Sequence, residues 1–205
     1  MVQVAGLFRM QGSFARIDTA ATSGGGAITV SAASVDLAGG RILSGGGGTA
    51  SCGDGGDVSL TATGSIQITA PIDATASADC GGGNVAITGA SIVVSQWISA
   101  SGNDAGLAAV ELSATNGSIS TLGAGEIRAN GAPVAPDTGG SGGTIVLAAT
   151  GDVSIGAALE ATGAIVDGSG GLIELYAGGN VTVSELLNAD GLGASSFGGS
   201  ITIEA

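Results

Sequence analysis

The chain of 205 residues contains no histidine and no lysine, and only 2% of its residues are aromatic. Without histidine there is no Ser-His-Asp triad, no imidazole metal site and no histidine general base. Without lysine there is no P-loop lysine and no Schiff base. Seventeen acidic residues against four arginines give a net charge of −13, which argues against binding nucleic acid through its phosphates.

Long apolar runs are also missing. No stretch approaches the roughly 18 apolar residues of a transmembrane helix, so we expect no membrane span. The first residues, MVQVAGLFRMQG, lack the charged and apolar regions of a signal peptide, and we expect any export signal to lie outside this chain. The residue in excess is glycine: 41 residues, or about three times the usual share.

A phrase that begins with Gly-Gly and continues as an alternating strand recurs along the chain. Its copies are GGAITV (25–30), GGDVSL (55–60), GGNVAI (82–87), GGTIVL (142–147), GGLIEL (170–175) and GGSITI (198–203), with a weaker copy GLAAVEL (106–112). Successive copies lie 25 to 35 residues apart. Their first apolar positions are predicted to be structurally equivalent: Ile28, Val58, Val85, Val110, Ile145, Ile173 and Ile201.

Each repeat contains two further short strands, such as SIQI (65–68) and PIDA (71–74), before a glycine-rich segment. Three short strands in each repeat predict a right-handed parallel β-helix of about seven coils, forming one solenoid domain over residues 1–205. The alternative all-β architecture is a sandwich, whose strands do not normally carry one phrase at one period. Alternation along the third strand of each repeat predicts six outward side chains: Asp18, Asp73, Ser99, Arg128, Glu160 and Asn188. Arg128 and Glu160 lie on successive coils, so we expect them to form an ion pair.

The stretches GGTIVLAATGDVSIGAALEATG (142–163) and GGLIELYAGGNVTVSELLNADG (170–191) resemble the repeats of filamentous-haemagglutinin-type exoproteins. These are large bacterial adhesins, many exported by two-partner secretion. The resemblance covers the chain from about residue 14 onward and implies an extracellular or cell-surface location. It transfers no functional residue, because the family's secretion domain is not recognisable here.

Two cysteines, Cys52 and Cys80, lie one coil apart and should stack at disulfide distance, which would fit an oxidising compartment. The alternative is two reduced thiols in a glycine-rich turn. Nearby carboxylates suggest a calcium site formed by Asp54, Asp57 and Asp79. The alternative is that aspartate simply suits turns.

The longest coil holds an insertion over residues 130–142. Its residues Pro133, Pro136 and Asp137 are candidates for a binding loop, or else the insertion is neutral. Trp97 and Tyr176 are aromatic candidates for stacking on a sugar, although each could equally fill a corner of the coil.

The sequence therefore predicts a non-catalytic, structural or adhesive rod of a bacterial surface or secreted protein, without a cofactor unless calcium binds. Both ends are expected to be open, which suggests either a piece of a longer parent chain or stacking of copies into extracellular filaments. The alternative is a module that binds or cleaves carbohydrate, such as a host or matrix glycan. Cleavage is disfavoured because the carboxylates are scattered over different faces and the short turns build no cleft.

Overall fold

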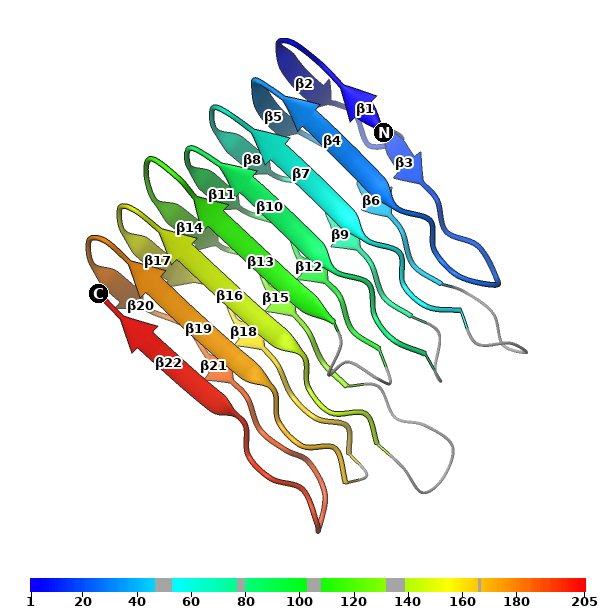
Figure 1. Cartoon of the computed structure of the whole chain (residues 1–205), viewed down its shortest axis with the longest axis vertical. Coiled ribbons are helices and arrows are strands. Elements are labelled where there is room, and N and C mark those ends of the chain that lie inside the picture. The colour runs from blue at the N-terminus through cyan, green and yellow to red at the C-terminus, as the bar shows by residue number, and fades with distance from the viewer. Residues whose placement is uncertain (47–52, 77–79, 103–107, 132–138, 166) are drawn as a thin grey trace.

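The computed structural model describes residues 1–46, 53–76, 80–102, 108–131, 139–165 and 167–205. In this part of the chain there is no helix, and hence none able to cross a membrane. The described strands form three parallel sheets of eight, seven and seven strands, and the chain visits the sheets in turn (Figure 1). The fold is thus a parallel β-solenoid with three strands in each coil, as the repeats predicted.

The first sheet, sheet A, consists of β1 (Val2–Gln3), β4 (Ile28–Ala32), β7 (Val58–Ala62), β10 (Val85–Gly89), β13 (Ala109–Ala114), β16 (Thr144–Ala149), β19 (Leu172–Ala177) and β22 (Ser200–Glu204). Sheet B consists of β2 (Leu7–Met10), β5 (Ser34–Leu37), β8 (Ile66–Ile68), β11 (Ile92–Val94), β14 (Ile119–Leu122), β17 (Val153–Gly156) and β20 (Val181–Val183). Sheet C consists of β3 (Arg16–Asp18), β6 (Arg41–Leu43), β9 (Ile72–Asp73), β12 (Ile98–Ser99), β15 (Ile127–Arg128), β18 (Leu159–Glu160) and β21 (Leu187–Asn188).

The predicted register along sheet A is confirmed at every copy of the Gly-Gly phrase. Ile28 pairs with Val58, and the series continues without a slip to the pair Ile173 and Ile201. Because side chains alternate between the two faces of a strand, this register places one apolar row inside along the whole stack. The core consists of stacked valine, isoleucine, leucine and alanine, which explains how a chain with few aromatics forms a continuous interior.

One strand was not predicted and one side chain differs from the expectation. The segment LFRM forms β2, which pairs with β5 in sheet B although it lies before the residues that the family resemblance covers. Ser99 was predicted to be exposed, but it is only 7% exposed. Its register partners are Asp73 and Arg128, so a short side chain lies between two longer ones on the outer face of sheet C. The predicted ion pair between Arg128 and Glu160 is present, with Nε and Oε2 3.4 Å apart.

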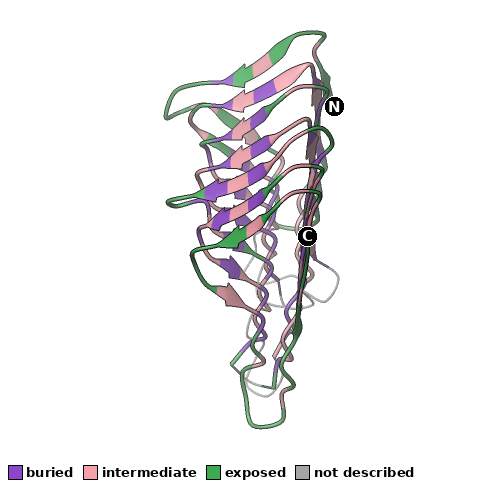
Figure 2. Cartoon of the chain, turned by 90° about the vertical axis from the view of Figure 1, so that its left-hand side faces the viewer, coloured by how far each residue is buried: buried purple, intermediate pink, exposed green. Residues whose placement is uncertain are grey.

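A thin extension, the glycine flange, projects from the edge between sheets C and A. It consists of the segment that leaves each sheet C strand and the segment that returns to the next sheet A strand. The two layers run close together beside the body formed by the sheets (Figure 2). Hydrogen bonds join them at equivalent places: the amides of Gly143, Gly171 and Gly199 donate to the carbonyls of Ala129, Ala161 and Ala189, each at 2.7 Å.

The layers of the flange are in direct backbone contact, which leaves no space for a side chain. A Cβ atom at Gly142 would overlap the carbonyl oxygen of Ala161 and lie 2.6 Å from the amide nitrogen of Gly171. Such approaches are closer than a real Cβ tolerates, and the obstructing atoms are backbone. Where a following coil covers the phrase, as at Gly55, Gly82, Gly142 and Gly170, its first glycine is therefore required by packing, and much of the high glycine content follows from the fold.

We predict that Gly142→Ala destabilises the protein by about 1–3 kcal/mol or more, because the new methyl group forces two backbone layers apart. Gly198→Ala is the matched control, since a Cβ at that position would have no heavy atom within 4 Å. Urea unfolding followed by circular dichroism measures both changes. Equal stability of the two variants would contradict a close-packed flange.

Candidate functional site: an open groove on sheet A

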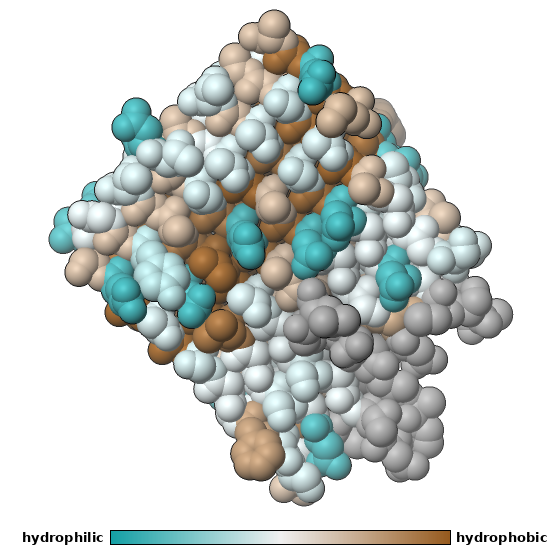
Figure 3. Space-filling view, viewed as in Figure 1, coloured by the Kyte–Doolittle hydropathy of each residue, from teal (hydrophilic) through white to brown (hydrophobic). Residues whose placement is uncertain are grey.

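The outer face of sheet A changes character along the solenoid. Its strands near the N-terminus present serine and threonine, whereas three later strands present Glu111, Glu174 and Glu204. Figure 3 shows this face as pale rows, with strongly hydrophilic side chains standing among more apolar ones. Glu111 and Glu174 directly follow the buried Val110 and Ile173, so the alternation of a strand turns both carboxylates outward.

The arginines are concentrated on the other two sheets and are all ion-paired. The Nε atom of Arg9 in β2 lies 2.8 Å from Oδ2 of Asp36, and Nη2 of Arg128 in β15 lies 2.6 Å from Oε2 of Glu126. Arg16 and Arg41, both in sheet C strands, pair with Asp18 and Asp73. These are the four basic side chains of the sequence. In the part of the chain that the structure describes, the carboxylates of sheet A consequently have no basic neighbour on their own sheet.

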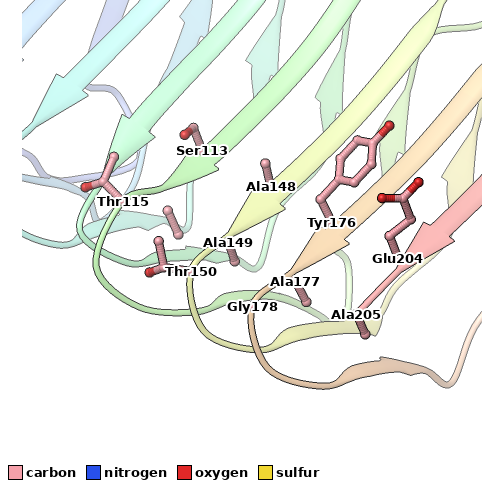
Figure 4. A pocket seen from close by; sticks show the side chains of 11 residues that line it. Ser113, Thr115, Ala148, Ala149, Thr150, Tyr176, Ala177, Gly178, Glu204 and Ala205 are labelled. Atoms are coloured by element: carbon pink, nitrogen blue, oxygen red, sulfur yellow. The ribbon is translucent and has the colours of Figure 1, made fainter.

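An open groove with a volume of about 660 Å³ crosses the strands at the edge of sheet A near its C-terminal end. Tyr176 of β19 has Ala148 and Glu204 as its register partners on the neighbouring strands. The methyl group of Ala148 leaves the space beside the taller Tyr176 empty, so a depression forms there. The groove is lined on its sides mainly by Ser113, Thr115, Ala148, Thr150, Tyr176 and Glu204, as Figure 4 shows.

The lining of the groove combines alanines with polar residues. Ala149 and Ala177 lie at the ends of β16 and β19, where the strands turn and the alanines are only half-buried. The hydroxyl groups of Thr115 and Thr150 stand on one side, in the turn that follows each strand. Figure 4 shows the Tyr176 ring on the other side, with the carboxylate of Glu204 beside it.

The Tyr176 hydroxyl is held by its neighbour two residues earlier on the same strand. A hydrogen bond to the Glu174 carboxylate raises the pKa of Tyr176 above its usual value of 10.0. Partial desolvation and the negative charges of Glu174 and Glu204 raise this pKa further. The phenol is neutral throughout the physiological range, and the raised pKa keeps it so at higher pH than a free phenol.

This arrangement suits binding better than bond cleavage. It combines an aromatic ring, several alanines, several hydroxyl groups and a carboxylate in a shallow and solvent-open depression. Such a mixture of apolar surface with a few polar groups is typical of ligand sites. Sequence analysis named Tyr176 as an aromatic candidate but missed the groove, because its other members come from strands about one coil apart.

The other predicted site residues are not brought together in this groove. Trp97 is half-buried at the corner between β11 and β12, where its carbonyl accepts a hydrogen bond from the Ile72 amide at 3.1 Å. The candidates of the insertion over residues 130–142, namely Pro133, Pro136 and Asp137, lie outside the described residues.

Two of the predicted calcium ligands, Asp54 and Asp57, accept hydrogen bonds from backbone amides. The Asp54 carboxylate accepts a hydrogen bond from the Gly81 amide at 3.1 Å, and that of Asp57 accepts one from the Asn84 amide at 2.9 Å. Both bonds join successive coils. Asp79 lies outside the described residues, and within the described ones no group of three metal-ligating side chains forms. Calcium binding therefore stays a prediction.

Cys80 is buried, with 2% of its surface exposed, at the start of the segment that returns to β10. Cys52 lies outside the described residues. The predicted disulfide between them is consequently not tested by the geometry described here.

A scan against protein-family models, a search of the curated proteins and a search of the solved structures each found no match to this chain.

Tyr176 is the only tyrosine of the chain, so spectrophotometric titration of the phenol reports on this site alone. We predict that the folded protein titrates above the pKa of a free phenol, and that Glu174→Gln lowers the value by removing both an ionised acceptor and a negative charge. The neutral phenol donates this hydrogen bond. The contribution of the bond to the free energy of unfolding is therefore present at lower pH, and it is lost as the pH rises through the pKa of Tyr176 in the folded protein.

The matched control is Glu111→Gln, which removes a carboxylate from the same face of sheet A but not from the surroundings of Tyr176. We expect this variant to titrate like the wild type. An identical titration of the wild type and Glu174→Gln would contradict the hydrogen bond.

Proposed function

We propose that this chain is a structural and adhesive rod, and that it acts without catalysing a reaction. The observation that carries the proposal is the uninterrupted register of three parallel sheets from β1 to β22. A stack of eight strands at about 4.8 Å per step spans roughly 35 Å, and each added coil extends it by the same amount. Such a solenoid holds its exposed faces at fixed distances along one axis.

The two ends of the stack support lengthening by further coils. At one end Val2, the register partner of the buried Val30, is 38% exposed, and at the other Ile201 and Ile203 are 45% and 49% exposed. Ile203 continues the row of Leu147 and Leu175, which are fully buried in the preceding coils. The end surfaces are thus cross-sections of the apolar core, and we propose that further β-solenoid coils cover them.

The resemblance to filamentous-haemagglutinin-type repeats supports a bacterial cell-surface or extracellular location. The high negative charge supports solubility through self-repulsion outside the cell. We also propose a disulfide between Cys52 and Cys80, which fits an oxidising compartment. One coil separates the two residues in the sequence, so like-on-like stacking would bring them to adjacent coils.

Stacking of the ends is tested by sedimentation velocity and negative-stain electron microscopy over a range of protein concentrations. We expect particles that lengthen with concentration, because burial of the exposed core rows favours contact between ends. Ile203→Lys should keep the particles short, since it places a charge on the apolar end surface.

Thr202→Lys is the matched control, because it adds the same charge on the same strand but on the outward face. This variant should lengthen like the wild type. Particles of one length at all concentrations would contradict the proposal that further coils cover the ends. Equal lengthening of both lysine variants would contradict it as well.

The disulfide is tested by alkylating the denatured protein with iodoacetamide before and after reduction, with detection by mass spectrometry. We expect labelling only after reduction. Cys80→Ser should lower stability by about 2–4 kcal/mol, because the open loop gains conformational entropy on unfolding. Replacing Cys52 as well should add little, since the bond is already lost; two cysteines labelled without reduction would refute the pairing.

A further inference from the structure

The groove beside Tyr176 points to a ligand that is both apolar and rich in hydroxyl groups. It is lined by the alanines Ala148, Ala149 and Ala177 and by the hydroxyl-bearing residues Thr115 and Thr150. A pyranose ring has the same division, with C–H groups on its faces and hydroxyls on its rim. We propose that the groove binds an uncharged oligosaccharide, with the Tyr176 ring as the surface against which one sugar stacks.

The position of Tyr176 favours this ligand. The short side chain of its register partner Ala148 leaves one side of the ring available for stacking, and the Tyr176 hydroxyl donates to Glu174. Glu204 lies beside the ring as its register partner and is exposed. Its carboxylate accepts hydrogen bonds from sugar hydroxyls, and charge-assisted bonds of this kind are stronger than neutral ones.

The charge of the surface determines which oligosaccharides are accepted. Glu111, Glu174 and Glu204 all face outward on this sheet, and the four arginines lie on sheets B and C. A sulfated or sialylated chain would meet like charge without a basic partner, which costs binding free energy. The groove therefore selects glycans without acidic groups.

The groove's position also sets the direction of the bound chain. It crosses the ends of β13, β16, β19 and β22, so its long direction runs across the strands and along the solenoid. An oligosaccharide with several units can span more than one coil there. This inference goes beyond the rod itself, which requires only the stacked core and not the groove.

The test measures binding of the whole chain to tetrasaccharides of glucose, mannose, galactose and N-acetylglucosamine by isothermal titration calorimetry. A heparin-derived tetrasaccharide and a sialylated tetrasaccharide serve as acidic probes. We expect at least one uncharged probe to bind, with an affinity that changes little with salt, and both acidic probes to bind more weakly. A site that recognised a cationic peptide instead would bind a lysine-rich peptide in preference to every sugar and lose it at high salt, which would overturn the proposal.

Variants assign the binding to the groove. Tyr176→Ala should weaken it by about tenfold or more through loss of the stacking surface, whereas Tyr176→Phe should retain it within about threefold. Phe197→Ala is the matched control, because it removes an exposed aromatic ring that does not line the groove. Ala148→Phe fills the depression and should abolish binding without removing any polar contact.

No binding of any uncharged probe would overturn the proposal, as would binding that is equally strong in Tyr176→Ala and the wild type. Circular dichroism of each variant shows whether the fold is retained. Chromatography of the oligosaccharide after long incubation with the protein distinguishes the glycan site from the non-catalytic rod. Shortened products would refute the non-catalytic role but not the glycan site. An intact oligosaccharide supports both proposals.

Discussion

Backbone hydrogen bonds between equivalent strands of successive coils are the interaction on which the structure depends. They hold each strand directly over its counterpart, so each side chain meets the same position of the coil before and after it. An interior built in this way is narrow, and side chains of similar size must follow one another along it. Stacked aliphatic residues meet that requirement, which is why valine, isoleucine and leucine recur where a globular core would also use aromatics.

The same constraint extends into the glycine flange, where it acts on backbone alone. Two layers are joined by amide-to-carbonyl bonds within a coil and between coils, and side chains are excluded from the contact. The ion pairs add little to this arrangement, because the arginine pairs are exposed and such pairs contribute about 0–1 kcal/mol. Hydrogen bonding and apolar burial, rather than charge, hold the coils together.

The fold could be predicted from the sequence because equivalent strands of a solenoid carry the same repeated phrase, and the phrase shows which residues pair. Ile28 and Ile201 could be equated across most of the chain, since every copy of the phrase keeps the same alternation. The strand β2 was not predicted from the sequence, because its residues LFRM do not follow a copy of the Gly-Gly phrase. The groove was not predictable in the same way: Tyr176 was visible as an aromatic residue, but its importance depends on the small Ala148 beside it and on Glu204, each one coil away. Differences between coils, not the repeat, create the candidate site.

The coils differ in length, and most of the difference lies at one edge of the molecule. Val110 pairs with both Val85 and Ile145, although it lies 25 residues after the first and 35 before the second. Most of that variation falls between sheets C and A: Ile98 precedes Val110 by 12 residues, whereas Ile127 precedes Ile145 by 18. Residues can thus be gained or lost at this edge while three faces keep their spacing, and the entropic cost of a longer connection grows only slowly. For a designer, this edge is the place to insert a foreign peptide into the rod without disturbing its sheets.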